Sequence, residues 1–303
     1  MKIAVQLFGH LRTYEKCYHA LHKHLLSKYD CDVFMHTWST IDHGTETWHK
    51  NKMRCASEST QNLLYKLEKN YALKGIKIED QMIENLGTIN AVGKDISVFG
   101  MKAMFHSMKV ANCLREEYQR KNGIKYDFVV ILRPDIFLKK DFVIKKFIKR
   151  LDDIEVNNTV FTAGYPMAGV LSDFKYLGAT DVLFFAKPNV LTTLYQNEDI
   201  FFNYFKANTI VNYGPEYYFS KTIEKTGFRS VLINFLVGDS FKILRPASAQ
   251  STRRSLLSIR VRKNFFKIQI LSIISVPIVR MQFNIGDIFS MFISIGASVE
   301  DEK

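Results

Sequence analysis

The chain has 303 residues, of which 47% are hydrophobic and 24% charged, which excludes a mainly disordered chain and suffices for the core of one large α/β domain with a tail. The 42 Lys and Arg residues against 30 Asp and Glu give a formal charge of +12, which favours a polyanionic partner: a nucleic acid, an anionic membrane surface or a phosphorylated small molecule. The four cysteines form no Cys-x-x-Cys pair, so we expect reduced thiols and no zinc site built from them.

The start of the chain has the pattern of a βαβ unit. Residues 3–8 form an apolar, strand-like run that ends at Gly9, residues 12–29 have apolar positions at helical spacing, and residues 32–37 form a second strand-like run. Two strands joined by a helix favour a right-handed parallel crossover. No basic segment, apolar segment or cleavage site of a secretory signal precedes the first run, so we expect a cytoplasmic protein.

The central and later parts of the chain continue the alternation of helices and strands. After a predicted long loop, the elements expected from their patterns are a helix at 61–73, a weak strand at 76–78, a helix at 99–119, a strand at 126–132, a strand at 182–186, helices at 189–204 and 216–226, and a strand at 231–237. The run at 126–132 is apolar on both faces, as a strand covered by helices on each side must be. The pattern predicts an α/β fold with an open, mainly parallel sheet between helices.

The composition changes after Arg245, which divides the chain into a predicted α/β domain at 1–245 and a basic segment at 246–303. The segment interleaves basic residues with large apolar ones between 253 and 267. Its longest uncharged run, residues 268–279, has 12 residues and contains Pro277, whereas a membrane-spanning helix needs about 20. We therefore expect this amphipathic segment to lie on an anionic membrane surface rather than to cross it.

The residues after the central strand, Arg133-Pro134-Asp135, are the first candidate site. Ligands of open α/β sheets bind at the carboxyl ends of the strands. An aspartate there can offer an oxygen to Mg²⁺ or Mn²⁺, and the forked guanidinium of Arg133 matches phosphate oxygens. The alternative is an ordinary turn at the end of a strand, with an Arg–Asp pair on the surface.

A second candidate follows the first strand. Backbone N–H groups at Gly9 and His10, together with the side chain of Arg12, can hold a diphosphate at the start of a helix. A plain strand–helix turn explains the same residues, and a lone histidine such as His10 is more often a satisfied polar residue than a catalyst. Neither a Walker A loop nor a Gly-x-Gly-x-x-Gly fingerprint occurs.

Two acidic residues are candidates for proton transfer. Glu216 follows Gly214-Pro215 at the start of a predicted helix, where it is either a general base or a carboxylate favoured by the helix dipole. Asp181 precedes a predicted strand and is either a turn residue or a polar group that faces the substrate. The histidines at 19, 22, 24 and 36 fit no metal-ligand motif, so we expect them to be surface or core residues.

Taken in order, these pieces resemble bacterial glycosyltransferases of surface-polysaccharide synthesis (lipopolysaccharide or capsule) of the GT-A type, near the WavE-like group. The pieces that match are Phe8-Gly9-His10-Leu11-Arg12-Thr13, Asp32-Val33-Phe34-Met35-His36-Thr37-Trp38, Tyr126-Asp127, Leu132-Arg133-Pro134-Asp135, the strand at Asp181, and Pro215-Glu216. Together they extend over residues 1–235.

The resemblance implies a GT-A-like fold and an enzyme that uses a nucleotide-diphosphate sugar. It places Asp135 at the last carboxylate of the Asp-x-Asp metal motif, which implies Mn²⁺ or Mg²⁺, with Arg133 in place of the first aspartate. Asp181 and Glu216 correspond to acceptor-side or catalytic carboxylates, although Val182 stands where glutamine is expected. The implied acceptor is a polysaccharide or lipid-linked saccharide at the inner face of the cytoplasmic membrane, and no nucleic acid is expected.

Two non-enzymatic functions remain as alternatives. The charge of +12 and the basic cluster at 253–267 also suit a nucleic-acid-associated protein, although no recognition-helix, zinc-finger, RRM or KH signature is present. A non-catalytic protein that lies on a membrane surface would need only the basic segment.

Overall fold

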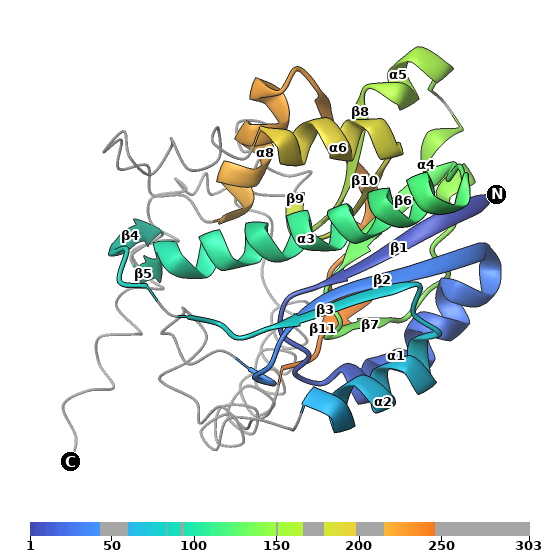
Figure 1. Cartoon of the computed structure of the whole chain (residues 1–303). Helices are drawn as coiled ribbons and strands as arrows, with labels where there is room; N and C mark the ends of the chain where they lie inside the picture. Colours follow the sequence, from blue (N-terminus) through green and yellow to red (C-terminus); the bar gives the residue numbers. More distant parts are fainter. Residues whose placement is uncertain are drawn as a thin grey trace, which may run out of the picture. The chain divides into compact units, whose positions relative to one another are not determined.

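A seven-stranded sheet forms the centre of the computed structural model, which describes residues 1–42, 60–82, 84–91, 94–149, 151–165, 179–197 and 215–245 (Figure 1). In spatial order its strands are β10 (Arg229–Leu236), β8 (Thr159–Gly164), β9 (Ala179–Ala186), β6 (Phe128–Leu132), β1 (Lys2–Phe8), β2 (Asp30–Trp38) and β3 (Gly75–Glu79). Only β9 runs antiparallel to its neighbours in this sheet; the other pairs are parallel. The predicted α/β fold with a mainly parallel sheet between helices is therefore confirmed.

The order of the strands creates a switch point between β1 and β6. From β1 the chain builds β2 and then β3 on one side, whereas β6 and the later strands lie on the other side of β1. The connections on the two sides of such a point diverge, which leaves a crevice beyond the carboxyl ends of the two strands. The strand order therefore makes the segments after Phe8 and Leu132 the candidate positions for ligand binding.

Helices cover both faces of the sheet (Figure 1). One face packs against α1 (Tyr14–His24) and α2 (Thr60–Tyr71), and the other against α3 (Val98–Asn122), α6 (Pro188–Gln196) and α8 (Pro215–Lys225). Alternate residues of β1 supply the two cores: Ile3, Val5 and Leu7 face α1 and α2, whereas Ala4 and Phe8 face α3. This alternation on a strand buried on both faces explains why β1 is almost uniformly apolar.

Smaller elements complete the described part. They are a 3-10 helix at Leu26–Lys28, the hairpin of β4 (Thr88–Ala91) and β5 (Lys94–Ser97), β7 (Ile136–Leu138), α4 (Ile144–Ile148), α5 (Asp153–Asn157) and β11 (Phe241–Ile243). β7 and β11 form an antiparallel pair outside the main sheet.

The ends of α3 are determined by its sequence. Before its first residue, the side chain of Ser97 accepts a hydrogen bond from the backbone N–H of Gly100, at 3.4 Å. After its last residue, Gly123 adopts a left-handed conformation with φ of 64°, which glycine tolerates and which stops the helix. The predicted helix at 99–119 is confirmed and is slightly longer than expected.

Some predicted boundaries were wrong. The first helix does not run over 12–29 but ends at His24 and is followed by the 3-10 turn. Asp181 does not precede a strand: β9 begins at Ala179, so Asp181 lies within it. The weak strand predicted at 76–78 is real and forms the edge strand β3.

Other predictions fall on residues that the structure does not describe. They are the middle of the long loop, at 43–59, the end of the helix predicted at 189–204, and the whole basic segment at 246–303. Within the described ranges, no helix is long and apolar enough to cross a membrane.

An aromatic cluster beside β9 generates a stability prediction. The fully buried ring of Phe185 stacks on Phe161 with 4.6 Å between centroids, and it meets Phe128 and Phe142 edge-on at 5.7 Å each. Phe185→Ala should lower the free energy of unfolding by about 3–5 kcal/mol, because it leaves a cavity that these rings cannot fill. Urea denaturation measures the loss.

The matched control is Ile154→Ala, because this apolar side chain is 74% exposed. Its effect should stay within about 0.5 kcal/mol. A loss below about 1 kcal/mol for Phe185→Ala would contradict the packing described for this cluster.

Candidate functional site

A cavity of about 570 Å³ lies at the carboxyl edge of the sheet, where β1 and β6 end. This volume is within the range of small-molecule sites. Among its lining residues are six that the sequence singled out: Gly9, His10, Arg12, Arg133, Asp181 and Glu216. The seventh, Asp135, lies behind the wall with no exposed surface.

The antiparallel strand β9 explains why Asp181 joins this edge. A strand that runs against its neighbours begins where they end: Leu183 pairs with Leu132, and the backbone N–H of Arg133 donates to the carbonyl of Val182 at 3.2 Å. Asp181 therefore lies just beyond the end of β6. Glu216 reaches the cavity from the first turn of α8.

The buried carboxylate of Asp135 holds two arginines in place. Its Oδ1 accepts a hydrogen bond from Arg133 Nε at 2.9 Å, and its Oδ2 accepts from Arg12 Nη1 at 3.0 Å and from Arg133 Nη2. Arg12 also donates from Nε to Asp42 Oδ1 at 2.9 Å. The Arg–Asp pair predicted as an alternative exists, but Asp135 is buried and Arg133 is partly buried at the cavity wall.

The charges in this network shift the pKa values of both partners. Burial acts to raise the pKa of Asp135, but the charges of Arg133 and Arg12 outweigh it and hold the pKa below its ordinary value. Burial acts to lower the pKa of Arg12, but the charges of Asp135 and Asp42 outweigh it and raise this pKa above its ordinary value. Asp135 is therefore ionised and Arg12 is charged at neutral pH.

This donor set does not fit the Mg²⁺ or Mn²⁺ ion predicted at Asp135. Both of its oxygens already accept guanidinium N–H groups, and an ion there would lie against two cations. Hard divalent ions need several oxygen ligands, whereas Asp135 is a single buried carboxylate. Its task in this geometry is to orient Arg12 and Arg133.

Arg245 is a site residue that the sequence analysis missed. The backbone N–H of Leu244 donates to the carbonyl of Asp135 at 2.8 Å, and the hydroxyl of Thr13 donates to the carbonyl of Leu244. These bonds bring Arg245 beside Arg133 and Arg12. Burial and the charges of these two arginines lower the pKa of Arg245 to about 10.

The arginine cluster has an excess of positive charge. Arg12, Arg133 and Arg245 face the cavity, and among the described residues the carboxylates that accept hydrogen bonds from them are those of Asp42 and Asp135. Within the part of the chain that the structure describes, Arg245 makes no ion pair with a carboxylate. This wall therefore suits an anionic ligand with several oxygens.

The two predicted catalytic carboxyl groups lie together in the same cavity. Burial raises the pKa of Asp181, and burial together with the charge of Asp181 raises the pKa of Glu216 to about 8. The hydroxyl of Tyr165 also points at Glu216 Oε1, at 3.5 Å. Two carboxyl groups that disfavour each other's charge titrate as a pair, which holds a proton near neutral pH.

Part of the backbone cradle predicted after the first strand is occupied by the protein itself. The N–H of Gly9 donates to Ser107 Oγ at 2.7 Å, and that of Arg12 donates to the carbonyl of Ile41 at 2.8 Å. Gly9 has a φ of 89°, which explains the glycine at this turn. The charge that this loop brings to the cavity is that of the Arg12 side chain.

Comparison with known proteins adds no family to this description. No protein-family model matches the chain, and no curated protein matches it. The function has to be inferred from the geometry of the cavity.

The raised pKa of Glu216 generates a stability prediction. Unfolded Glu216 loses its proton near pH 4.5, whereas the folded protein holds it to about pH 8. Ionisation therefore favours the unfolded state increasingly between these values. Glu216→Gln removes this cost, so it should stabilise the protein progressively more from pH 5 to pH 8, by up to about 1.4 kcal/mol for each pH unit in this range.

Unfolding midpoints in urea across this pH range measure the effect. The control is Glu117→Gln on the exposed side of α3, which should show no such growth with pH. A constant difference between Glu216→Gln and the original protein would show that the carboxyl is not held protonated.

Proposed function

We propose that the chain is a glycosyltransferase of the GT-A type that transfers a sugar from a nucleotide-diphosphate donor to a saccharide acceptor. The observation that carries this proposal is the division of one cavity into an arginine wall and a pair of carboxyl groups with raised pKa values. The position of the cavity at a switch point of a mainly parallel sheet supports it, because nucleotides bind at such points.

The arginine wall binds the diphosphate of the donor. Guanidinium groups bind phosphate oxygens with paired hydrogen bonds, and Asp135 holds two of them ready before the ligand arrives. During transfer the diphosphate gains negative charge as it leaves the sugar. Arg12, Arg133 and Arg245 stabilise this charge in place of a metal ion.

The carboxyl pair takes the proton of the acceptor hydroxyl. In an inverting transfer, the acceptor oxygen attacks the anomeric carbon and the bond from that carbon to the diphosphate oxygen breaks. The bonding electrons leave with the diphosphate, and the acceptor hydroxyl gives its proton to the pair formed by Asp181 and Glu216. A base with a pKa near the working pH is the most effective for this step.

The acceptor side of the proposal extends beyond the described residues. A lipid-linked or polysaccharide acceptor, an anionic membrane surface and a cytoplasmic location are implied by the resemblance and by the basic segment at 246–303. They stay predictions, because this segment lies outside the described ranges.

Nucleotide binding tests the arginine wall. In a thermal-shift screen of UDP, GDP, CDP and CMP, each with Mn²⁺ or with EDTA, one diphosphate should raise the unfolding midpoint above the others. Stabilisation should be about 2.7 kcal/mol at ~100 times its dissociation constant. Arg245→Ala should weaken binding about tenfold or more, because a hydrogen bond to a charged group contributes about 1.5–3 kcal/mol.

The control for this variant is Arg229→Ala. Arg229 is the first residue of β10, pairs with Glu155 and does not line the cavity. This control variant should bind the nucleotide as the original protein does. No shift with any nucleotide at millimolar concentration would favour the non-catalytic membrane protein or the nucleic-acid-associated protein instead.

Turnover measurements test whether the carboxyl pair acts as the base and whether transfer proceeds without a metal ion. With sugar nucleotides of the base that the screen identifies, release of the nucleoside diphosphate should continue in EDTA. Asp181→Asn and Glu216→Gln should each lower kcat about 10²–10⁴-fold while the nucleotide still raises the unfolding midpoint. Glu117→Gln is the control, and full activity in both carboxyl variants would rule out a base at this position.

A further inference from the structure

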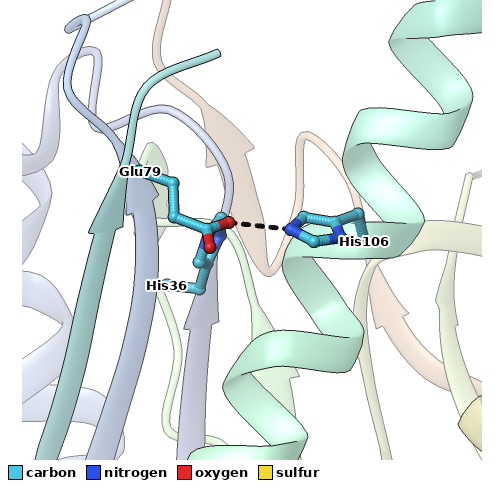
Figure 2. Close-up of side chains that lie close together, drawn as sticks. All are labelled: His36, Glu79 and His106. Carbon is cyan, nitrogen blue, oxygen red and sulfur yellow. Dashed lines mark hydrogen bonds and ion pairs between the residues drawn. The ribbon is translucent and has the colours of Figure 1, made fainter. Parts of the chain in front are cut away.

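Three potential metal ligands meet beside the cavity, on three different elements (Figure 2). His36 lies in β2, Glu79 ends β3 and His106 is on α3. Glu79 Oε2 is 2.9 Å from His36 Nε2 and 2.8 Å from His106 Nε2. None of the three residues lines the cavity of the proposed function.

We propose that His36, Glu79 and His106 bind a divalent transition-metal ion, with Zn²⁺ as the representative, and that the ion fastens α3 to β2 and β3. Two imidazole nitrogens and one carboxylate oxygen are a donor set that zinc accepts, with water in the remaining position. The same donors suit Co²⁺ and disfavour Mg²⁺, which prefers oxygen ligands alone.

The two contacts of Glu79 are slightly shorter than an ion requires, and the three ligand atoms lie within 4.8 Å of one another. Around a tetrahedral zinc with the usual bond lengths, ligand atoms lie about 3.4 Å apart. Each contact of Glu79 with a histidine would therefore lengthen by about half an ångström. The two ligands that have to move are the less buried ones, because the side chain of His106 is 46% exposed and that of Glu79 is 24% exposed.

The third ligand, His36, is fixed in orientation. Its side chain is fully buried, and its Nδ1 lies 2.6 Å from Ser107 Oγ. Ser107 can accept the Nδ1–H together with the N–H of Gly9, and can donate its own hydrogen to the carbonyl of His36 at 3.4 Å. That arrangement leaves the lone pair of Nε2 directed toward Glu79 and His106, as expected of a metal-binding histidine with an outer hydrogen-bond partner.

Neighbouring groups shape the cluster further. Trp38 stacks on the ring of His106 with 5.8 Å between centroids and meets His36 edge-on at 4.9 Å. Lys77 pairs with the other carboxylate oxygen of Glu79, which leaves Oε2 for the histidines. The competing explanation is a purely structural arrangement in which Glu79 accepts hydrogen bonds from both rings, and metal titration separates the two.

The test uses the full chain without a histidine tag, stripped with EDTA, dialysed and titrated with Co²⁺. The expected result is one equivalent bound, with visible absorption bands that added Zn²⁺ removes. His106→Ala and Glu79→Gln should each weaken Co²⁺ binding by at least about 100-fold, since loss of an outer partner alone costs about 10–100-fold. Equal unfolding midpoints in EDTA show that both variants still fold.

The matched control is His24→Ala. His24 also pairs with a carboxylate, Asp141, at 2.8 Å, but belongs to α1. It should keep the affinity of the original chain. The proposal is overturned if the original chain binds no stoichiometric Co²⁺, if both ligand variants bind it normally, or if His24→Ala weakens binding as much as they do.

Discussion

The carboxylate of Asp135 is the group on which the arrangement of the cavity depends. A buried ion without partners costs several kcal/mol, so its presence at 0% exposure requires the two guanidinium groups that bind it. Those bonds direct Arg12 from the loop after β1 and Arg133 from the end of β6 to the same point. The backbone bond from Leu244 to Asp135 then adds Arg245. One buried charge thus joins segments from the two ends of the described chain.

Much of the sheet and part of the cavity could be predicted from the sequence. Of the run predicted at 126–132, residues 128–132 form the strand and are apolar on both faces, as a strand covered by helices on each side must be. Parallel strands bring their carboxyl ends to one edge, which is why the two predicted sites at Arg12 and Arg133 lie together on Asp135. The position of Asp181 within β9 could not be seen, because the residues from Ala179 onward show no change of pattern at the true start of the strand.

The residues that could not be predicted from the sequence were missed for a common physical reason: their partners come from distant parts of the chain. Arg245 reaches the cavity because the short strand β11 pairs with β7, about a hundred residues earlier, and strands of three residues leave no periodic pattern. His36, Glu79 and His106 come from three elements with no local spacing between them, so no motif search would find them. The pairing of Asp135 with Arg12 was likewise not predicted: the position of Asp135 after a strand suited a metal ligand, whereas both of its oxygens bind the guanidinium groups of Arg12 and Arg133.

The carboxyl groups in and behind the cavity wall differ in the direction of their pKa shifts because of the arginines and not because of burial. Burial acts to raise the pKa of Asp135, Asp181 and Glu216 alike, and only Asp135 has guanidinium contacts that reverse the effect. The charge of Arg133 also lowers the pKa of Asp181 and Glu216, though too weakly to cancel burial. An anion bound to Arg133 would offset that charge and raise the pKa of the pair further. Anion binding and the protonation of the carboxyl pair would then be coupled through one arginine, because an anion on Arg133 would make the pair hold its proton to a higher pH.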